Sequence, residues 1–167
     1  MLKIIIAMSE LNTEQLMAVY RESNLANCKS FYSDLTADEQ LKKAETVFLS
    51  YLREDFFRQK NAVYAIWVVD GVYRSALRLE PYKDGLLLQA LETAPDARRT
   101  GCAYKLMEAV IAFLRTTQWR RVYSHIEKRN TPSIGVHRKC GFKQISDSAT
   151  YIDGTVTQSS ATFCIEL

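Results

Sequence analysis

The stretch TAPDARRTGCA, residues 93–103, lies between a run typical of a strand and a run typical of a helix, and it decides the fold. Upstream, residues 86–93 form a short and largely apolar run, the pattern of a buried strand. Downstream, apolar side chains recur every three or four residues, at Ala103, Leu106, Met107, Val110, Ile111 and Leu114. This spacing predicts an amphipathic helix that begins just after Gly101.

The start of this predicted helix is suited to binding an anion. The first backbone N–H groups of a helix have no acceptor inside it, and the helix dipole places positive charge there. Because Gly101 has no side chain and Ala103 a small one, a phosphate group can approach these N–H groups closely. Neither Gly-x-x-x-x-Gly-Lys-Ser/Thr nor Gly-x-Gly-x-x-Gly occurs in the chain. The stretch therefore predicts a pyrophosphate site, and it argues against nucleotide hydrolysis and a dinucleotide-binding fold.

The rest of the chain predicts blocks of helices and strands. The capping box Thr36-Ala37-Asp38-Glu39 starts the second of two early helices, which runs to about Phe57. Turns at Asp70-Gly71, at residues 83–85 and at Asp153-Gly154 separate strands. The predicted order is βααβββαβαββ, with strands at residues 1–6, 62–69, 72–80, 86–93, 122–127, 142–152 and 155–165, and helices at 13–24, 36–57, 103–114 and 132–139. An aromatic set in the first helical region is predicted to be core: Phe31, Tyr32, Tyr51, Phe56 and Phe57.

Length and composition limit the class of protein. The 167 residues, 47% of them apolar, fit one globular domain over residues 1–167. The longest apolar runs fall far short of the roughly 20 residues that a membrane-spanning helix needs, so no membrane association is expected. The four cysteines form no Cys-x-x-Cys pair and the chain has only two histidines, which argues against a metal site and for free thiols in the cytoplasm.

Charge is distributed unevenly along the chain. The net charge is only +3, but residues 98–139 contain ten basic side chains and two acidic ones, a balance of +8. A solvated arginine-rich surface and an anionic ligand both account for such a segment. A nucleic acid is disfavoured as the ligand, because the arginines are scattered over several predicted elements and no nucleic-acid-binding motif is present.

Two motifs about 30 residues apart resemble those of the GNAT superfamily of N-acetyltransferases. The first, Arg98-x-x-Gly101-x-Ala103, matches the superfamily pattern Gln/Arg-x-x-Gly-x-Gly/Ala. The second, Asn130-x-x-Ser133-x-x-x-His137-x-x-Cys140-Gly141-Phe142, is similar to its pattern Asn-x-x-Ala/Ser-x-x-x-Tyr-x-x-x-Gly-Phe, and the ribosomal-protein N-terminal acetyltransferases are the branch it resembles. The resemblance implies an α/β (α+β) fold, a single GNAT-like domain with a mixed, mostly antiparallel sheet of about seven strands and helices on both faces.

The resemblance also implies acetyl-CoA as cosubstrate. Backbone amides from about Arg99 to Tyr104 would hold the CoA pyrophosphate, and the strand ending at Glu92-Thr93 would pair with the pantetheine arm in a V-shaped gap beside residues 122–127. The residues implied in cofactor binding are Leu91, Thr93, Arg98, Arg99, Thr100, Gly101, Cys102, Ala103, Tyr104, Asn130 and Ser133. The +8 segment would then attract the phosphate charges of CoA.

Attack of an amine on a thioester requires a base, because an alkylamine with a pKa of about 10.4 is protonated at neutral pH. His125 occupies the position of the proposed base in the ribosomal-protein branch, and Glu92 is a second candidate. The alternatives are a strand histidine bonded to a neighbour and a solvated carboxylate. A backbone amide near Thr93 could stabilise the oxyanion. His137, where the family often has tyrosine, is the candidate acid, with Tyr104 and Tyr123 as further possibilities.

The motifs together predict an N-acetyltransferase that acts on a primary amine of a small molecule or peptide, by direct attack in a ternary complex. In the family the first two helices shape the acceptor pocket, so residues 20–60 are expected to do so here. The alternative is a non-catalytic acyl-CoA-binding regulatory module, which the histidine at position 137 suggests. Monomer and homodimer are both compatible with the sequence.

Overall fold

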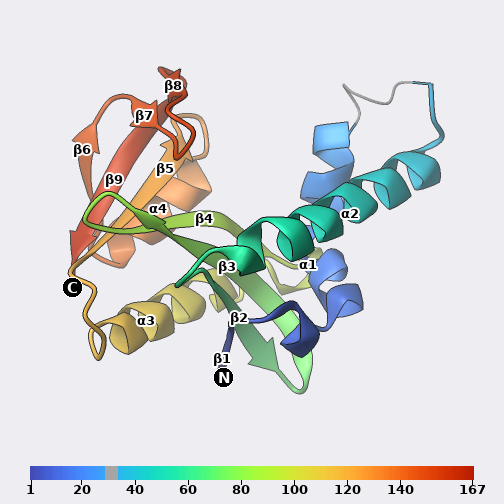
Figure 1. Cartoon of the computed structure of the whole chain (residues 1–167), viewed down its shortest axis with the longest axis horizontal. Coiled ribbons are helices and arrows are strands. Elements are labelled where there is room, and N and C mark those ends of the chain that lie inside the picture. The colour runs from blue at the N-terminus through green and yellow to red at the C-terminus, as the bar shows by residue number, and fades with distance from the viewer. Residues whose placement is uncertain (29–33) are drawn as a thin grey trace.

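The central sheet has seven strands in the spatial order β1-β2-β3-β4-β5-β9-β6 (Figure 1). The computed structural model describes residues 1–28 and 34–167, and all statements on structure concern these residues. The strands of this sheet are β1 (Leu2–Ile5), β2 (Val63–Val69), β3 (Val72–Tyr82), β4 (Gly85–Thr93), β5 (Arg121–Glu127), β6 (Lys143–Ser146) and β9 (Ser160–Glu166). Only β4 and β5 are parallel neighbours, which confirms the predicted mixed, mostly antiparallel sheet.

Helices cover both faces of the sheet. They are α1 (Thr13–Cys28), α2 (Ala37–Glu54), α3 (Cys102–Leu114) and α4 (Thr131–Lys139), with short 3-10 turns η1 (Met8–Glu10), η2 (Phe56–Arg58) and η3 (Pro95–Ala97). Side chains of successive strand residues point to opposite faces. In β2, Tyr64 and Ile66 pack in one core cluster with α1, whereas Ala65 between them packs in the other with α3. The alternation explains why two helical layers are needed to bury this sheet.

The second helix begins and ends close to its predicted limits. The Thr36 hydroxyl accepts from the Glu39 N–H, and the Glu39 carboxylate accepts from the Thr36 N–H, so the predicted capping box is present. The α-helix stops at Glu54, and residues 56–58 form a 3-10 turn instead of the last predicted α-helical residues. Phe56 is fully buried in the core that α1 and α2 cover, and Tyr51 and Phe57 pack against it. Phe31 and Tyr32 lie outside the described residues.

The C-terminal strands differ from the prediction of one long hairpin. Only β6 and β9 pair in the main sheet, and β7 (Ala149–Thr150) and β8 (Val156–Thr157) form a separate two-stranded sheet. Hydroxyl groups interrupt both long strands: Ser146 Oγ accepts from the Ser148 N–H, and Thr157 Oγ1 accepts from the Ser159 N–H. Such local bonds offer the backbone an alternative to the strand ladder, so each predicted strand breaks in two.

The parallel pair β4 and β5 is joined over only three residues. Leu86, Leu87 and Leu88 lie opposite Val122, Tyr123 and Ser124. Beyond this point β4 continues to Thr93 and β5 to Glu127, but the two strands no longer pair with each other. Figure 1 shows β5, β9 and β6 (orange to red) turned away from β3 and β4 (green). The V-shaped gap expected between these strands is therefore present.

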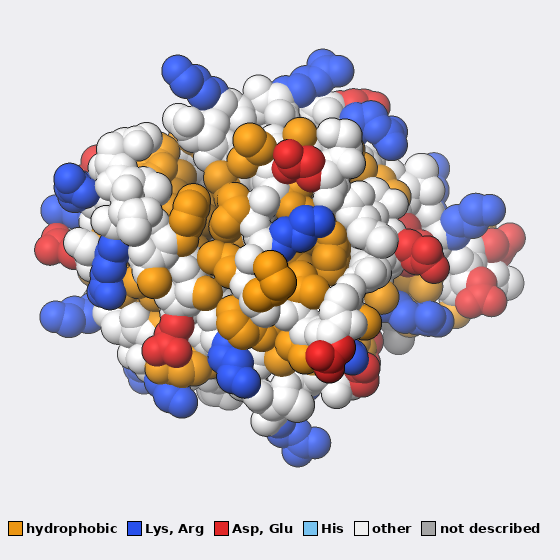
Figure 2. Space-filling model, turned by 90° about the horizontal axis from the view of Figure 1, so that it is seen from below, with side chains coloured by type: hydrophobic (Ala, Val, Ile, Leu, Met, Phe, Trp, Pro, Cys, Tyr) orange, Lys and Arg blue, Asp and Glu red, His pale blue; other side chains and the backbone are white. Residues whose placement is uncertain are grey.

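The surface seen from below the view of Figure 1 has no dominant charge. Figure 2 shows hydrophobic side chains gathered toward the middle of this face, with lysines and arginines mostly around its rim and acidic side chains among them. On this face, basic side chains do not form one continuous patch. None of the helices within residues 1–28 and 34–167 has the length and hydropathy of a membrane span.

Candidate functional site

A β-bulge in β4 opens the V between the two parallel strands. Ala76 on β3 lies opposite Glu92 and Arg78 opposite Gln89, so two residues of β4, Ala90 and Leu91, face one residue of β3. Ala90 adopts a left-handed conformation with φ of 51°. A bulge of this kind bends its strand and increases the local twist. The end of β4 therefore leaves β5, and the strand edge is exposed where a pantetheine arm could pair with it.

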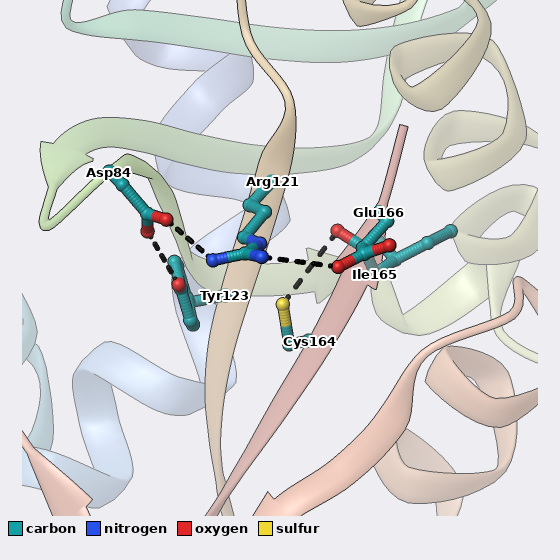
Figure 3. Close-up of polar contacts among 6 residues, drawn as sticks. All are labelled: Asp84, Arg121, Tyr123, Cys164, Ile165 and Glu166. Carbon is teal, nitrogen blue, oxygen red and sulfur yellow. Dashed lines mark hydrogen bonds and ion pairs between the residues drawn. The ribbon is translucent and has the colours of Figure 1, made fainter.

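At the end of the V where β4 and β5 pair, hydrogen bonds join three side chains, those of Asp84, Arg121 and Tyr123 (Figure 3). Asp84 accepts a hydrogen bond from Arg121 Nη1 at 2.6 Å and another from the Tyr123 hydroxyl at 2.6 Å. Gly85 permits the close approach of the strands, because a β-carbon there would collide with the Arg121 carbonyl oxygen. The hydroxyl of Tyr123, one of the candidate acids, is thus directed to Asp84 and not to the open end.

The loop between β4 and α3 presents unoccupied backbone donors. Arg99 and Gly101 both adopt left-handed conformations, with φ of 61° and 84°. The first backbone hydrogen bond of α3 runs from the Lys105 N–H to the Gly101 carbonyl at 2.9 Å. The N–H groups at 102–104 precede it and find no acceptor within the described part of the chain. A β-carbon at Gly101 would meet nothing within 4 Å, so the space beside this residue is open.

A cavity of about 610 Å³ lies at this loop and extends to the start of α4. At its far side Asn130 caps α4, its Oδ1 accepting from the Ser133 N–H at 3.1 Å. Thr100 is the one predicted cofactor residue that does not line the cavity, because its hydroxyl donates to the Ala97 carbonyl at 2.5 Å. The predicted cofactor residues that line it are Leu91, Thr93, Arg98, Arg99, Gly101, Cys102, Ala103, Tyr104, Asn130 and Ser133.

A second cavity, of about 660 Å³, lies between α1, α2 and the middle of the sheet. Tyr20, Phe48 and Tyr51 provide aromatic walls, and Ser23, Asn24 and Arg78 provide polar ones. Leu91 and Glu92 line this cavity and the first one alike. The two cavities therefore approach one another at the strand end that follows the bulge, so that molecules bound in each could react there.

Glu92 is the only one of the three predicted catalytic residues that lines either cavity. Its carboxylate accepts from the Thr93 N–H at 3.3 Å, so the amide considered for the oxyanion already has a partner in this structure. Burial raises the pKa of the half-buried Glu92 carboxyl, the positive charge of Arg98 opposes this rise, and Glu22 adds to it. Arg98 and Glu22 form an ion pair of 2.5 Å that links α1 to the loop before α3. A carboxylate with a raised pKa is a stronger base than a solvated one.

His125 has partners on both ring nitrogens. Nε2 lies 2.9 Å from the Thr150 carbonyl oxygen and Nδ1 lies 3.1 Å from the Thr162 hydroxyl. Its ring packs edge-on against Tyr82 and Tyr151, and burial lowers its pKa. The ring thus holds the small β7–β8 sheet against β5 and β9, and its role as a base remains a prediction.

His137 is buried within α4. Its Nδ1 lies 2.8 Å from the Ser133 carbonyl oxygen, and its ring packs edge-on against Phe142. Burial lowers the pKa of His137 to about 4, so the ring is neutral near pH 7. His137 therefore links Ser133 and Phe142, which belong to the same sequence motif. A role for His137 as an acid remains a prediction.

Tyr104 is the remaining candidate acid, and it lines the first cavity. Its hydroxyl donates to the Glu108 carboxylate, and Lys139 Nζ lies 4.1 Å from the centre of its ring. The hydrogen bond to Glu108 raises the pKa of Tyr104. Tyr104 is thus the candidate acid that lines the first cavity, although its hydroxyl, like that of Tyr123, donates to a carboxylate in this structure.

A splayed parallel strand pair, unoccupied amides at a helix start and two cavities that meet at one strand end define the class of CoA-dependent acyltransferases. The described residues include no cluster of His, Cys, Asp and Glu side chains that could hold a metal ion. The chain belongs to the acetyltransferase (GNAT) family, whose model matches residues 25–142. The protein is thus an acyltransferase, and acetyl-CoA is its cosubstrate.

Solved structures share this fold at low sequence identity. The PaiA N-acetyltransferase from Thermoplasma acidophilum, in complex with coenzyme A, is 14% identical with a TM-score of 0.70, over 100% of this chain and 99% of that one. The ribosomal-protein-S18-alanine N-acetyltransferase from Escherichia coli is 16% identical with a TM-score of 0.62, over 99% and 94%. An N-acetyltransferase from Staphylococcus aureus Mu50 is 17% identical with a TM-score of 0.60, over 99% and 98%. No curated protein sequence matches the chain.

Proposed function

We propose that the protein transfers the acetyl group of acetyl-CoA to a primary amine of a small molecule or peptide, by direct attack in a ternary complex. The observation that carries the proposal is the pair of cavities that share Leu91 and Glu92. Separate cavities allow donor and acceptor to be bound at the same time. No covalent enzyme intermediate is needed when the two reacting groups meet directly.

Each part of the first cavity has a role in holding the donor. The N–H groups at residues 102–104 face the pyrophosphate, and the positive end of the α3 dipole favours its charge. The β4 edge beyond the bulge offers backbone groups to the amide groups of the pantetheine arm. Asn130 and Ser133 border the same cavity from α4. These contacts would place the thioester beside Leu91 and Glu92.

Glu92 is the base of the proposed reaction. Its carboxylate takes a proton from the acceptor ammonium, directly or through one water, and the free amine then attacks the thioester carbonyl carbon. The C–N bond forms, the nitrogen of the tetrahedral intermediate loses its second proton to water, and the C–S bond breaks. The CoA thiolate leaves and takes up a proton, for which Tyr104 is the donor we propose, and solvent returns a proton to Tyr104. The amide product is neutral, so it no longer interacts with Glu92 as an ammonium does.

The test is release of free thiol from acetyl-CoA across a panel of amines that contains polyamines, aminoglycosides, amino acids and N-terminal peptides. Direct transfer predicts initial-velocity plots that intersect when both substrates are varied, whereas an acetyl-enzyme would give parallel lines. Acetyl-CoA should also raise the melting temperature. Stabilisation by acetyl-CoA without turnover of any amine would support the regulatory module instead.

The proposal also includes the cellular compartment and the oligomeric state of the enzyme. We place the enzyme in the cytoplasm, because acetyl-CoA is an intracellular metabolite and Cys28, Cys102, Cys140 and Cys164 are free thiols. Each chain contains both cavities, so a monomer and a homodimer could each carry out the reaction.

A further inference from the structure

Arg78 is the positively charged side chain on the wall of the second cavity. It comes from the middle of β3 and is half-buried. Its guanidinium carbon lies 4.9 Å from the centre of the Tyr51 ring, 5.7 Å from that of Phe56 and 5.8 Å from that of Phe48. Aromatic faces attract a guanidinium but cannot accept its hydrogen bonds as an oxygen anion does. The rings therefore hold the side chain in place and leave its donors available.

Two nitrogen donors of Arg78 lack hydrogen-bond partners within residues 1–28 and 34–167. Nε and Nη1 are buried and make no hydrogen bond there, and no acidic side chain forms an ion pair with Arg78. The carboxylate two residues along the strand, Glu80, is already engaged: it accepts from the Tyr51 hydroxyl at 3.3 Å and from Gln59 Nε2 at 3.1 Å. Buried guanidinium donors without acceptors are unfavourable, so an anionic group of a ligand in this cavity would stabilise Arg78.

The position of Arg78 relative to Glu92 sets the size of the ligand. Ala76, two residues before Arg78 on the same face of β3, lies directly opposite Glu92. Arg78 itself lies opposite Gln89, and only the bulge at Ala90 and Leu91 separates this pair from the Ala76–Glu92 pair, so Arg78 and Glu92 are near neighbours across the two strands. Both side chains line the same cavity. One small molecule can therefore present an ammonium group to Glu92 and an anionic group to Arg78.

We infer that the acceptor is an amino acid or another amine that carries a carboxylate, and that Arg78 binds this carboxylate. The inference rests on the proposed function, since it names the acceptor of the same reaction. A carboxylate supplies the missing acceptors of the guanidinium, and the aromatic rings enclose the carbon chain between the two charged ends. A polyamine would instead place a second ammonium group against Arg78.

The experiment compares amino acids with their amides, which have the same length and lack the negative charge. Glycine, β-alanine, γ-aminobutyrate and ε-aminocaproate are each paired with the corresponding amide, and kcat/KM is measured for both at saturating acetyl-CoA. We expect kcat/KM to be about tenfold or more higher for the acid form at the favoured length, as for a charge-assisted hydrogen bond. In R78M the acid-to-amide ratio should fall to about one, and R78K should retain part of it.

A matched control separates recognition from folding. Arg74 lies on the same strand, pairs with Asp96 and lines neither described cavity, so R74M should keep the wild-type ratio. A purely structural role of Arg78 would lower turnover of acid and amide alike and leave their ratio unchanged, which would overturn the inference. Faster turnover of the amides by wild-type enzyme would also overturn it, with the proposed function intact. Silence of the whole series, the amines of the first panel included, would overturn both.

Discussion

Gly101 offers the sharpest test of the cofactor cradle, because replacing it with alanine separates backbone strain from ligand contact. Gly101 has φ of 84°, a conformation that disfavours any side chain, yet a β-carbon there would meet nothing within 4 Å. The cost to the free protein is therefore the strain alone, about 1 kcal/mol. For a chain of this size, such a loss lowers the melting temperature by about 3 °C.

Gly71 provides a control with the same strain at a distant place. It has φ of 77°, also with nothing within 4 Å, and it lies in the turn between β2 and β3. We expect G71A and G101A to lose similar stability without ligand. The difference should appear with CoA, because Gly101 lines the cavity at the start of α3 and Gly71 does not.

The assay is thermal unfolding of both variants and wild type, with and without CoA. At a CoA concentration about 100 times the wild-type Kd, linkage predicts a stabilisation of about 2.7 kcal/mol, or about 8 °C. G71A should show the same ligand-induced shift. A tenfold weaker Kd in G101A would reduce its shift by about 1.4 kcal/mol, or about 4 °C. Equal shifts in the two variants would refute the assignment of the pyrophosphate to the start of α3.

Three further predictions concern the base, the bulge and the buried histidine. E92Q should lower kcat by about 10² to 10³, with little change in CoA affinity measured by calorimetry. In the wild type, the pH profile of kcat/KM should have an acidic limb at a higher pH than a solvated glutamate would give, because the pKa of Glu92 is raised. E92Q should lack this limb. Y20F should lower the free energy of unfolding by about 1 kcal/mol in urea, because the Tyr20 hydroxyl donates to the Ala90 carbonyl at 2.6 Å. His137 has a pKa of about 4 in the folded protein and of about 6.5 in the unfolded chain. The unfolded chain therefore binds the proton more readily. The free energy of unfolding should fall by about 3 kcal/mol as the pH drops from 6.5 to 4. H137Q should lack this part of the acid loss in parallel urea titrations, and an identical loss in both proteins would contradict the buried neutral ring.

The cavity to which we assign the cofactor is lined by residues that the sequence motifs single out, because its determinants are local. A helix start, a glycine and a small residue two positions later fix the cradle within residues 98–104, and the helical period of α3 marks where it begins. The same holds for the capping of α4 by Asn130. Features that depend only on residues close together in sequence can be predicted from the pattern of residues.

For the proposed acceptor half, the resemblance predicts only that residues 20–60 take part; the side chains that line the cavity could not be predicted, because they depend on contacts between residues far apart in sequence. Tyr20 meets Ala90 from 70 residues away, and no local pattern marks either residue. Arg78 alternates with the apolar residues Leu77 and Leu79, an arrangement that usually indicates a solvent-facing side chain, but α1 and α2 cover that face. The bonds that occupy both ring nitrogens of His125 likewise come from Thr150 and Thr162, on other strands.

Helix α1 couples the two halves of the site. Tyr20 lines the acceptor cavity and also binds the carbonyl of the bulged residue that opens the V. Glu22, two residues further, holds Arg98 beside the cofactor cavity. A shift of α1 that enlarged the second cavity would therefore disturb its contacts with β4 and with the loop before α3. Acceptor specificity can therefore change at α1 positions such as Ser23 and Asn24, which line only the acceptor cavity, whereas Tyr20 and Glu22 are constrained by the cofactor side as well.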